Sequence, residues 1–146
     1  MKRVCISVVV FSLAVLPAAA TSSDVQFRLV VECKPGLAGY LAPEGKRICV
    51  SQDVIIDGTN ILFAKPMHDK FSEIVSFTFD KTAQARLSDV SSHHVGGRIA
   101  IINHDALVAA PVIVSQISGG EMEVHTPDKK TADDILKQFQ DRTLVK

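Results

Sequence analysis

The strongest constraint on the fold is a run at 74–79, β-branched or aromatic at every position but Ser76, that ends directly at an aspartate. Such side chains favour an extended strand, and Asp80 after them is a residue type that caps helix N-termini. Beyond the cap, apolar residues recur at the spacing of one helix face: Ala83, Leu87 and Val90. The sequence therefore predicts a strand that passes without a loop into a helix ending near residue 92.

Extended segments account for most of the remaining chain. Alternating apolar and polar side chains predict a strand at 25–31, whereas the glycines and prolines of residues 35–45 predict a loop. Shorter apolar runs bounded by turn residues predict strands at 47–50, 53–56, 61–64, 98–103, 106–114 and 121–125. The turns are expected at Asp57-Gly58, His104-Asp105 and Gly119-Gly120. Pro111 cannot donate a ladder hydrogen bond, so its strand is expected at a sheet edge or with a bulge.

A second helix is expected near the C-terminus, with Thr131 as its N-cap. Acidic residues in its first turn (Asp133, Asp134) and basic residues towards its end (Lys137, Arg142) match the helix dipole. Its expected buried face consists of Ala132, Ile135, Leu136 and Phe139. Together these elements predict an α+β fold: an antiparallel or mixed sheet with two helices packed on one face.

The first twenty residues have the pattern of a secretory signal peptide. Lys2 and Arg3 precede an apolar run at 4–16, and small residues follow up to Ala20, where we expect cleavage. The alternative is an uncleaved anchor, but a spanning helix needs about 20 apolar residues. We therefore expect a periplasmic or secreted chain with no stable membrane span after signal removal.

Two cysteines remain once Cys5 has left with the signal. In an oxidising compartment, Cys33 and Cys49 are most simply a disulfide, closing a loop of about 17 residues and stabilising the fold by about 3 kcal/mol. The alternative, a reactive or metal-binding pair, lacks C-x-x-C spacing.

Charge argues against nucleic acid as a partner. The 16 Lys and Arg residues balance the 16 Asp and Glu residues, and removing Lys2 and Arg3 leaves 14 against 16, a net charge of about −2. There is no Trp and only one Tyr, so platforms for stacking bases are few.

Several motifs resemble chemical sites without meeting their requirements. Residues 39–46 resemble a phosphate loop, but the glycines are six apart rather than five, and Arg47 stands where Ser or Thr would bind magnesium. Asp53 and Asp57 suit turn chemistry better than an acid–base dyad.

The histidines do not form a recognisable site either. Asp89, His93 and His94 could gather near a helix end, but a closed zinc site needs a further ligand, and the other histidines are scattered. Ser91 and Ser92 beside them lack the G-x-S-x-G nucleophile elbow. We expect no catalytic residue, no metal site and no cofactor.

The second half of the chain resembles a known family. Phe77-Thr78-Phe79-Asp80, then 96–102, 109–113, 117–121 and 131–136 follow in an order and spacing similar to the head subdomain of the first periplasmic domain of SecD, a membrane component that assists Sec-dependent protein export. The motif positions are Phe77, Phe79, Asp80, Ala100, Pro111, Gly119 and Gly120.

This resemblance covers about residues 53–140 and sets the expected domains. Residues 21–52 are expected to be an N-terminal strand and loop extension with the disulfide, and 53–146 the head-like domain. One departure is His104-Asp105, where family members usually place Asp-Gly. Another is that no span is expected after the signal, so the membrane-embedded residues of SecD have no counterpart.

The resemblance implies a non-enzymatic module that binds an unfolded polypeptide or a Sec translocase component. Exposed sheet edges can hold a chain through backbone hydrogen bonds without reading its sequence. The alternative is an exported, disulfide-stabilised binding domain for an envelope ligand, unrelated to export.

Overall fold

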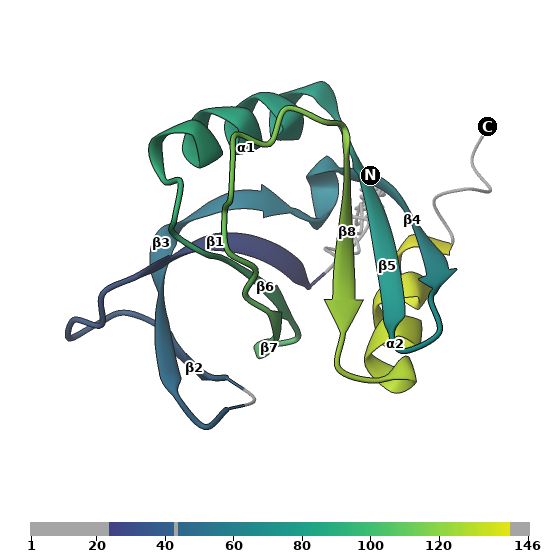
Figure 1. The fold of residues 1–146 in the computed structure, drawn as a ribbon, viewed down its shortest axis with the longest axis horizontal. Helices are drawn as coiled ribbons and strands as arrows, with labels where there is room; N and C mark the ends of the chain where they lie inside the picture. Colours follow the sequence, from purple (N-terminus) through teal and green to yellow (C-terminus); the bar gives the residue numbers. More distant parts are fainter. Residues whose placement is uncertain (1–23, 43, 141–146) are drawn as a thin grey trace, which may run out of the picture.

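The computed structural model describes residues 24–42 and 44–140, drawn in Figure 1. The signal peptide and the cleavage after Ala20 that the sequence predicts lie outside the described residues. The elements follow in the order β1 (Val25–Val31), β2 (Gly39–Leu41), β3 (Arg47–Asp57), η1 (Gly58–Asn60), β4 (Ile61–His68), β5 (Glu73–Phe79), α1 (Lys81–His93), β6 (Ile99–Asn103), β7 (Ala106–Ala109), β8 (Glu121–Thr126) and α2 (Lys129–Gln140).

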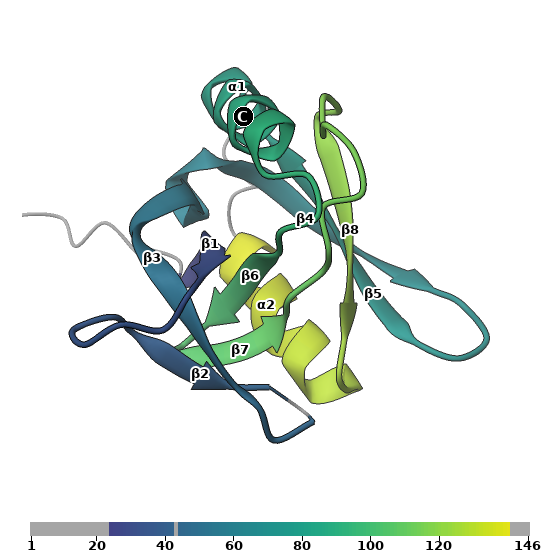
Figure 2. The same cartoon turned by 60° about the vertical axis from the view of Figure 1, so that its left-hand side comes forward.

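Strands divide between two antiparallel sheets. The larger has the order β2-β3-β1-β6-β7 and the smaller the order β4-β5-β8. The larger sheet curls so far that its two edge strands, β2 and β7, contact each other. Figure 2 shows these two strands side by side. An α+β fold with antiparallel pairing and two helices is thereby confirmed, with two sheets in place of one.

The larger sheet differs from the prediction at β2 and β3. Residues 39–41 lie in the expected loop, but they pair with β3, Tyr40 lying opposite Ile48. The two short strands predicted at 47–50 and 53–56 are one strand, because irregular pairing with β1 on either side of Arg28 lets β3 continue. The boundary expected between residues 52 and 53 falls inside this strand.

The disulfide predicted between Cys33 and Cys49 is present, with the two Cα atoms 5.0 Å apart. It ties the segment after β1 to β3, beside the position where Cys49 lies opposite Val31.

Both helices follow capping aspartates. The predicted cap of α1 is confirmed: the Asp80 carboxylate accepts hydrogen bonds from Ala83 N (2.7 Å) and Asn60 Nδ2 (3.1 Å), and these bonds hold the pKa of Asp80 below its usual value. The prediction of Thr131 as the cap of α2 is wrong. This helix begins at Lys129, and the Asp128 carboxylate accepts from Thr131 N at 2.7 Å.

Aromatic residues join the two sheets and α2 in one core. Phe27 on β1 meets Phe77 and Phe79 of β5 edge-to-face, each at 5.6 Å between ring centroids, and Phe77 also meets Phe139 of α2 at 6.2 Å. The buried face predicted for α2 is confirmed, since it joins this core. A smaller cluster of Val50, Ala100 and Ile102 lies apart from it.

Candidate functional site

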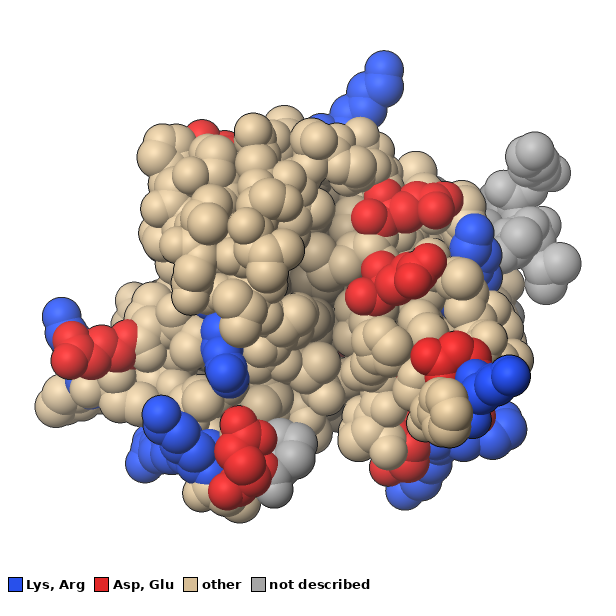
Figure 3. All heavy atoms as spheres, viewed as in Figure 1, with Lys and Arg blue, Asp and Glu red and all other residues tan. Residues whose placement is uncertain are grey.

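A groove opens where the two sheets approach each other. Its walls come from residues 107–110 at the end of β7 and 125–127 at the end of β8, with Ala42, Glu44 and Arg98 completing a volume of about 290 Å³. Figure 3 shows the surface hollowed between the part with β2, β3 and β7 and the part with β8, and acidic side chains gathered over β5 and β8.

β8 borders this groove as an edge strand whose outer backbone groups are unpaired. Its pairing with β5 runs without a bulge from Thr78–Glu121 to Glu73–Thr126, and Phe79 N donates to Gly120 O at 2.9 Å. Because bonded residues alternate along an antiparallel ladder, Met122 and Val124 point their backbone groups at β5. The N–H and C=O groups of Glu121, Glu123 and His125 therefore point away from it, and no described strand pairs with them.

The opposite side of the groove is the edge strand β7 and the chain after it. Ile99 N donates to Pro111 O (3.1 Å) and Ile113 N to Gly97 O (2.8 Å), so this chain continues along β6 after β7 has ended. The bridge between Arg98 and Val112 lies between those two bonds, and the backbone groups of Val112 therefore point outward. The expected strand at 106–114 is thus shorter as β7, with irregular pairing beyond Ala109.

Comparison with known proteins assigns the chain to a family. Residues 35–141 match the family described as SecDF, P1 head subdomain. The chain belongs to this family. The match begins before Asp53 and includes residues 35–52, which the sequence pattern assigned to an extension.

Individual relatives agree with the family. The chain is 32% identical over 117 residues to the protein translocase subunit SecD of Acetobacter pasteurianus, covering 71% of this chain and 22% of the relative. It is 28% identical over 75 residues to that of Rickettsia typhi, covering 51% of this chain and 14% of the relative. The chain thus spans about a fifth or less of these relatives' length.

Solved structures show the same fold. A structure of SecDF, described as a membrane component that enhances protein export, superimposes with a TM-score of 0.61 at 21% identity, covering 81% of this chain and 62% of that one. SecDF in its super-membrane-facing form also gives 0.61 at 21% identity, over 80% of this chain and 18% of that one. Within residues 24–42 and 44–140, no helix of this P1 head has the length and apolarity to cross a bilayer.

Most motif residues of this P1 head stabilise the fold. Phe77 and Phe79 are fully buried in the main core, and Ala100 is buried in the smaller cluster. Asp80 caps α1, and Pro111 supplies a carbonyl to β6 next to the groove.

The two motif glycines differ in their surroundings. A Cβ on Gly120 would lie 2.8 Å from Gln84 Nε2, which donates to Phe79 O at 2.8 Å, so a side chain there would displace a bond that closes the β5–α1 junction. Gly119 has room for a Cβ, whose nearest contact would be Glu121 O at 3.8 Å.

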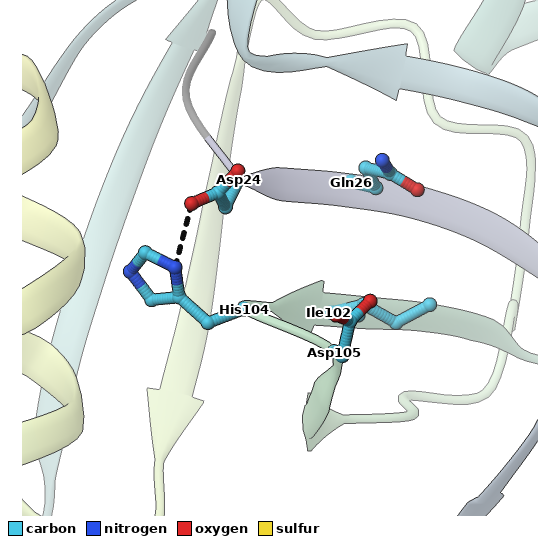
Figure 4. Close-up of a pocket in the computed structure, with 5 residues that line it drawn as sticks. All are labelled: Asp24, Gln26, Ile102, His104 and Asp105. Carbon is cyan, nitrogen blue, oxygen red and sulfur yellow. Dashed lines mark ion pairs between the residues drawn. The ribbon is translucent and has the colours of Figure 1, made fainter. Parts of the chain in front are cut away.

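A small polar pocket lies beside the turn where this P1 head departs from its family. Figure 4 shows His104 and Asp24 pointing toward one another, and His104 Nδ1 lies 2.6 Å from Asp24 Oδ2. His104 (φ 47°) and Asp105 (φ 62°) both adopt the left-handed conformation that favours glycine, asparagine or aspartate in hairpin turns. Both side chains are half-exposed, and they carry opposite charges only when His104 is protonated, so the contact adds little to stability.

The structure does not assemble the other candidate residues into a site. His93 Nδ1 lies 3.7 Å from Asp89 Oδ1, but within the part of the chain described no third metal-binding side chain joins a cluster. Ser91 is buried and accepts from Ile117 N at 2.8 Å. Asp57 caps η1, accepting from Thr59 N at 2.7 Å.

Within the described residues, the segment that resembled a phosphate loop begins in a strand. Gly39 belongs to β2, and the Arg47 guanidinium fills the space where a Cβ of Gly39 would stand. Sequence reasoning missed the outward backbone of β8, since its alternating pattern predicts a strand but not which neighbours it lacks.

Proposed function

We propose that this P1 head is a non-enzymatic module of Sec-dependent protein export that binds an extended polypeptide or a translocase component outside the inner membrane. Family membership and relatives named as translocase subunits support a role in export. The observation that carries the proposal is the pair of outward-facing backbone edges, at β8 and at Val112, near a groove that the ends of β7 and β8 line.

The physical basis requires no catalytic residue. A surface that holds an emerging polypeptide outside the membrane hinders its backward sliding. Backbone hydrogen bonds hold an extended chain whatever its sequence, and each contributes only about 0.5–1.5 kcal/mol. A few such bonds give contacts brief enough for the chain to move on.

The proposal includes export of this protein itself. The signal pattern of residues 1–20 supports delivery across the inner membrane. The Cys33–Cys49 disulfide supports an oxidising compartment, because such bridges are rare in the cytosol.

Photo-crosslinking in living cells tests this function. A crosslinking residue replaces Glu123 at the β8 edge, and a matched control replaces Ala85, an exposed residue of α1 away from the groove. During active export we expect Glu123, but not Ala85, to capture precursor polypeptides or translocase subunits. Equal capture at both sites, or capture of neither class, contradicts the proposal.

A second measurement separates the alternative role. If the domain binds an envelope ligand unrelated to export, deleting its gene leaves the export rate of other proteins unchanged. An export role predicts slower signal-peptide removal from those proteins in the deletion strain.

A further inference from the structure

We propose that β8 receives the bound polypeptide as an added strand, and that the preferred segment alternates basic and apolar residues. This inference rests on the proposed function and assigns it an edge and a partner chemistry.

In the part of the chain that the structure describes, three of the four sheet edges have a short strand or a proline, and β8 has neither. β2 has only three residues, and β7 has four and ends two residues before Pro111. β4 is longer but contains Pro66 opposite Val75. Short strands and prolines are devices that prevent a sheet edge from pairing with any other chain, whereas charged side chains exclude mainly partners of the same charge. β8 has six residues, no proline and two glutamates, so its backbone stays open to a chain of opposite charge.

Pro66 lies at a position of β4 where the backbone nitrogen points away from the sheet, so it removes a donor that another strand could use. Val75 bonds through its backbone to β8, so its partner on β4 is in a non-bonded pair and its nitrogen points outward. Pro66 has no N–H to offer there. On β8 the outward positions are Glu121, Glu123 and His125, each of which keeps both a donor and an acceptor.

The side chains next to that outward backbone carry uncompensated negative charge. Glu121 and Glu123 are exposed, and their partners on β5 are the uncharged Thr78 and Ser76. Among the described residues, neither carboxylate has an ion-pair partner; Glu121 accepts only a long bond from Thr78 Oγ1 at 3.4 Å. Lysine or arginine on an added strand would lie directly across from them, the arrangement that stabilises cross-strand pairs.

At the His125 end of β8, the other face of an added strand would meet the groove. Its walls beside β8 are largely apolar: Leu107, Val108, Ala109, Ala110 and Pro127. The two charged lining residues, Arg98 and Glu44, have opposite signs. Apolar side chains at alternate positions of the segment therefore fit this side, because strand residues alternate between faces.

The same charges argue against a second copy of this chain. Antiparallel pairing of β8 with β8 centred on Glu123 would place this glutamate against itself, and like charges directly opposite one another are destabilising. The edge therefore disfavours self-pairing and favours a basic segment.

Amide hydrogen exchange by NMR tests the edge directly. The probe is a capped peptide in which lysine and valine alternate, with a glutamate–valine peptide of equal length as control. At a peptide concentration about ten times the Kd, exchange at Glu121, Glu123 and His125 is expected to slow about tenfold. Met122 and Val124 already bond to β5 and are expected to change far less.

Charge variants test the chemistry. Replacing both carboxylates (E121Q and E123Q) is expected to weaken the lysine–valine peptide several-fold, up to about tenfold. The matched control E32Q, at an exposed site near the disulfide, leaves its affinity unchanged. Equal binding of the two peptides, or no effect of the double variant, overturns the proposed chemistry.

The outcomes also distinguish a failure of this inference from a failure of the proposed function on which it rests. Slowed amides around Val112 with β8 unaffected would overturn the β8 assignment while leaving polypeptide binding intact. Absence of binding by either peptide, together with no capture at Glu123 in cells, would overturn both. Protection of the β8 amides by self-association without peptide would identify a second copy as the occupant.

Discussion

β4 and β8 are the two edges of one three-stranded sheet, and they differ in what they offer another chain. Both pair with β5 along most of their length, and both present three exposed or half-exposed residues on the outer face. β4 has a proline at an outward backbone position, whereas β8 has a full set of donors and acceptors flanked by glutamates. The proline hinders another strand from pairing with β4, whereas the backbone of β8 can still accept one. The difference therefore comes from the residues of the two strands, since both occupy the same kind of position in the sheet.

The largest expected effect comes from the strand that both edges share. Phe77→Ala removes a fully buried ring from the contacts with Phe27 and Phe139 and is expected to cost about 3–5 kcal/mol. Urea unfolding measures the loss. A change below about 1 kcal/mol would mean that β5 does not anchor the two edges.

The next test compares neighbouring residues of β8 itself. Val124→Pro removes an N–H bonded to β5 and leaves a buried carbonyl unpaired, which is expected to cost about 2 kcal/mol or more. Glu123→Pro removes only an outward N–H and is expected to keep the fold while weakening peptide binding several-fold, up to about tenfold. Urea unfolding measures the stability of both proline variants, and peptide titration measures their binding. Similar stabilities for the two variants would contradict the pairing register between β8 and β5.

A smaller effect is expected at the junction between β4, β5 and α1. Asp80→Ala removes the helix cap and the bond to Asn60, which precedes β4, and is expected to cost about 1 kcal/mol at pH 7. Because the pKa of Asp80 is lowered on folding, mainly by the Ala83 N–H, its contribution is present above about pH 4 and is lost as the pH falls below that.

The control for this position is Asp80→Asn. Asparagine caps helices nearly as well but does not titrate, so this variant should keep most of the stability and lose that part of the acid dependence. Urea unfolding between pH 2.5 and pH 7 distinguishes the variants. An unchanged acid dependence in both would assign it to other groups, such as Asp69 and Asp128, whose pKa values are also lowered by backbone hydrogen bonds.

The smallest change in stability is expected from opening the protected edge. Pro66→Val restores an outward N–H on β4 without altering its pairing with β5. We expect nearly unchanged stability but new self-association or peptide binding at β4, measured by light scattering and amide exchange. A variant that stays monomeric and gains no binding would show that Pro66 is not what protects this edge.

The sequence predicted those features of the fold that depend on residues close together in the chain. The Asp80 cap, the strand before it and the apolar face of α2 depend on contacts a few residues apart, and the structure bears them out. The start of α2 was misplaced because Asp128 and Thr131 are both capping residue types, and only the hydrogen bond distinguishes them.

Long-range pairing determines the rest. β2 forms within a glycine-rich segment because β3 lies beside it, and the division of strands between two sheets has no local signature. Pro111 correctly indicated irregular pairing near a sheet edge. The open backbone of β8 could not be predicted, since a strand pattern is the same whether one neighbour or two are present.

The contact of Phe77 with both Phe27 and Phe139 has a consequence for the order in which this protein can fold. The three rings span almost all of the described sequence, so the core contains interactions of very high sequence separation. Such contacts form late, because a long loop must close before they are made. A chain that emerges N-terminus first, from a ribosome or through a membrane, can therefore complete this aromatic core only after most of α2 has appeared.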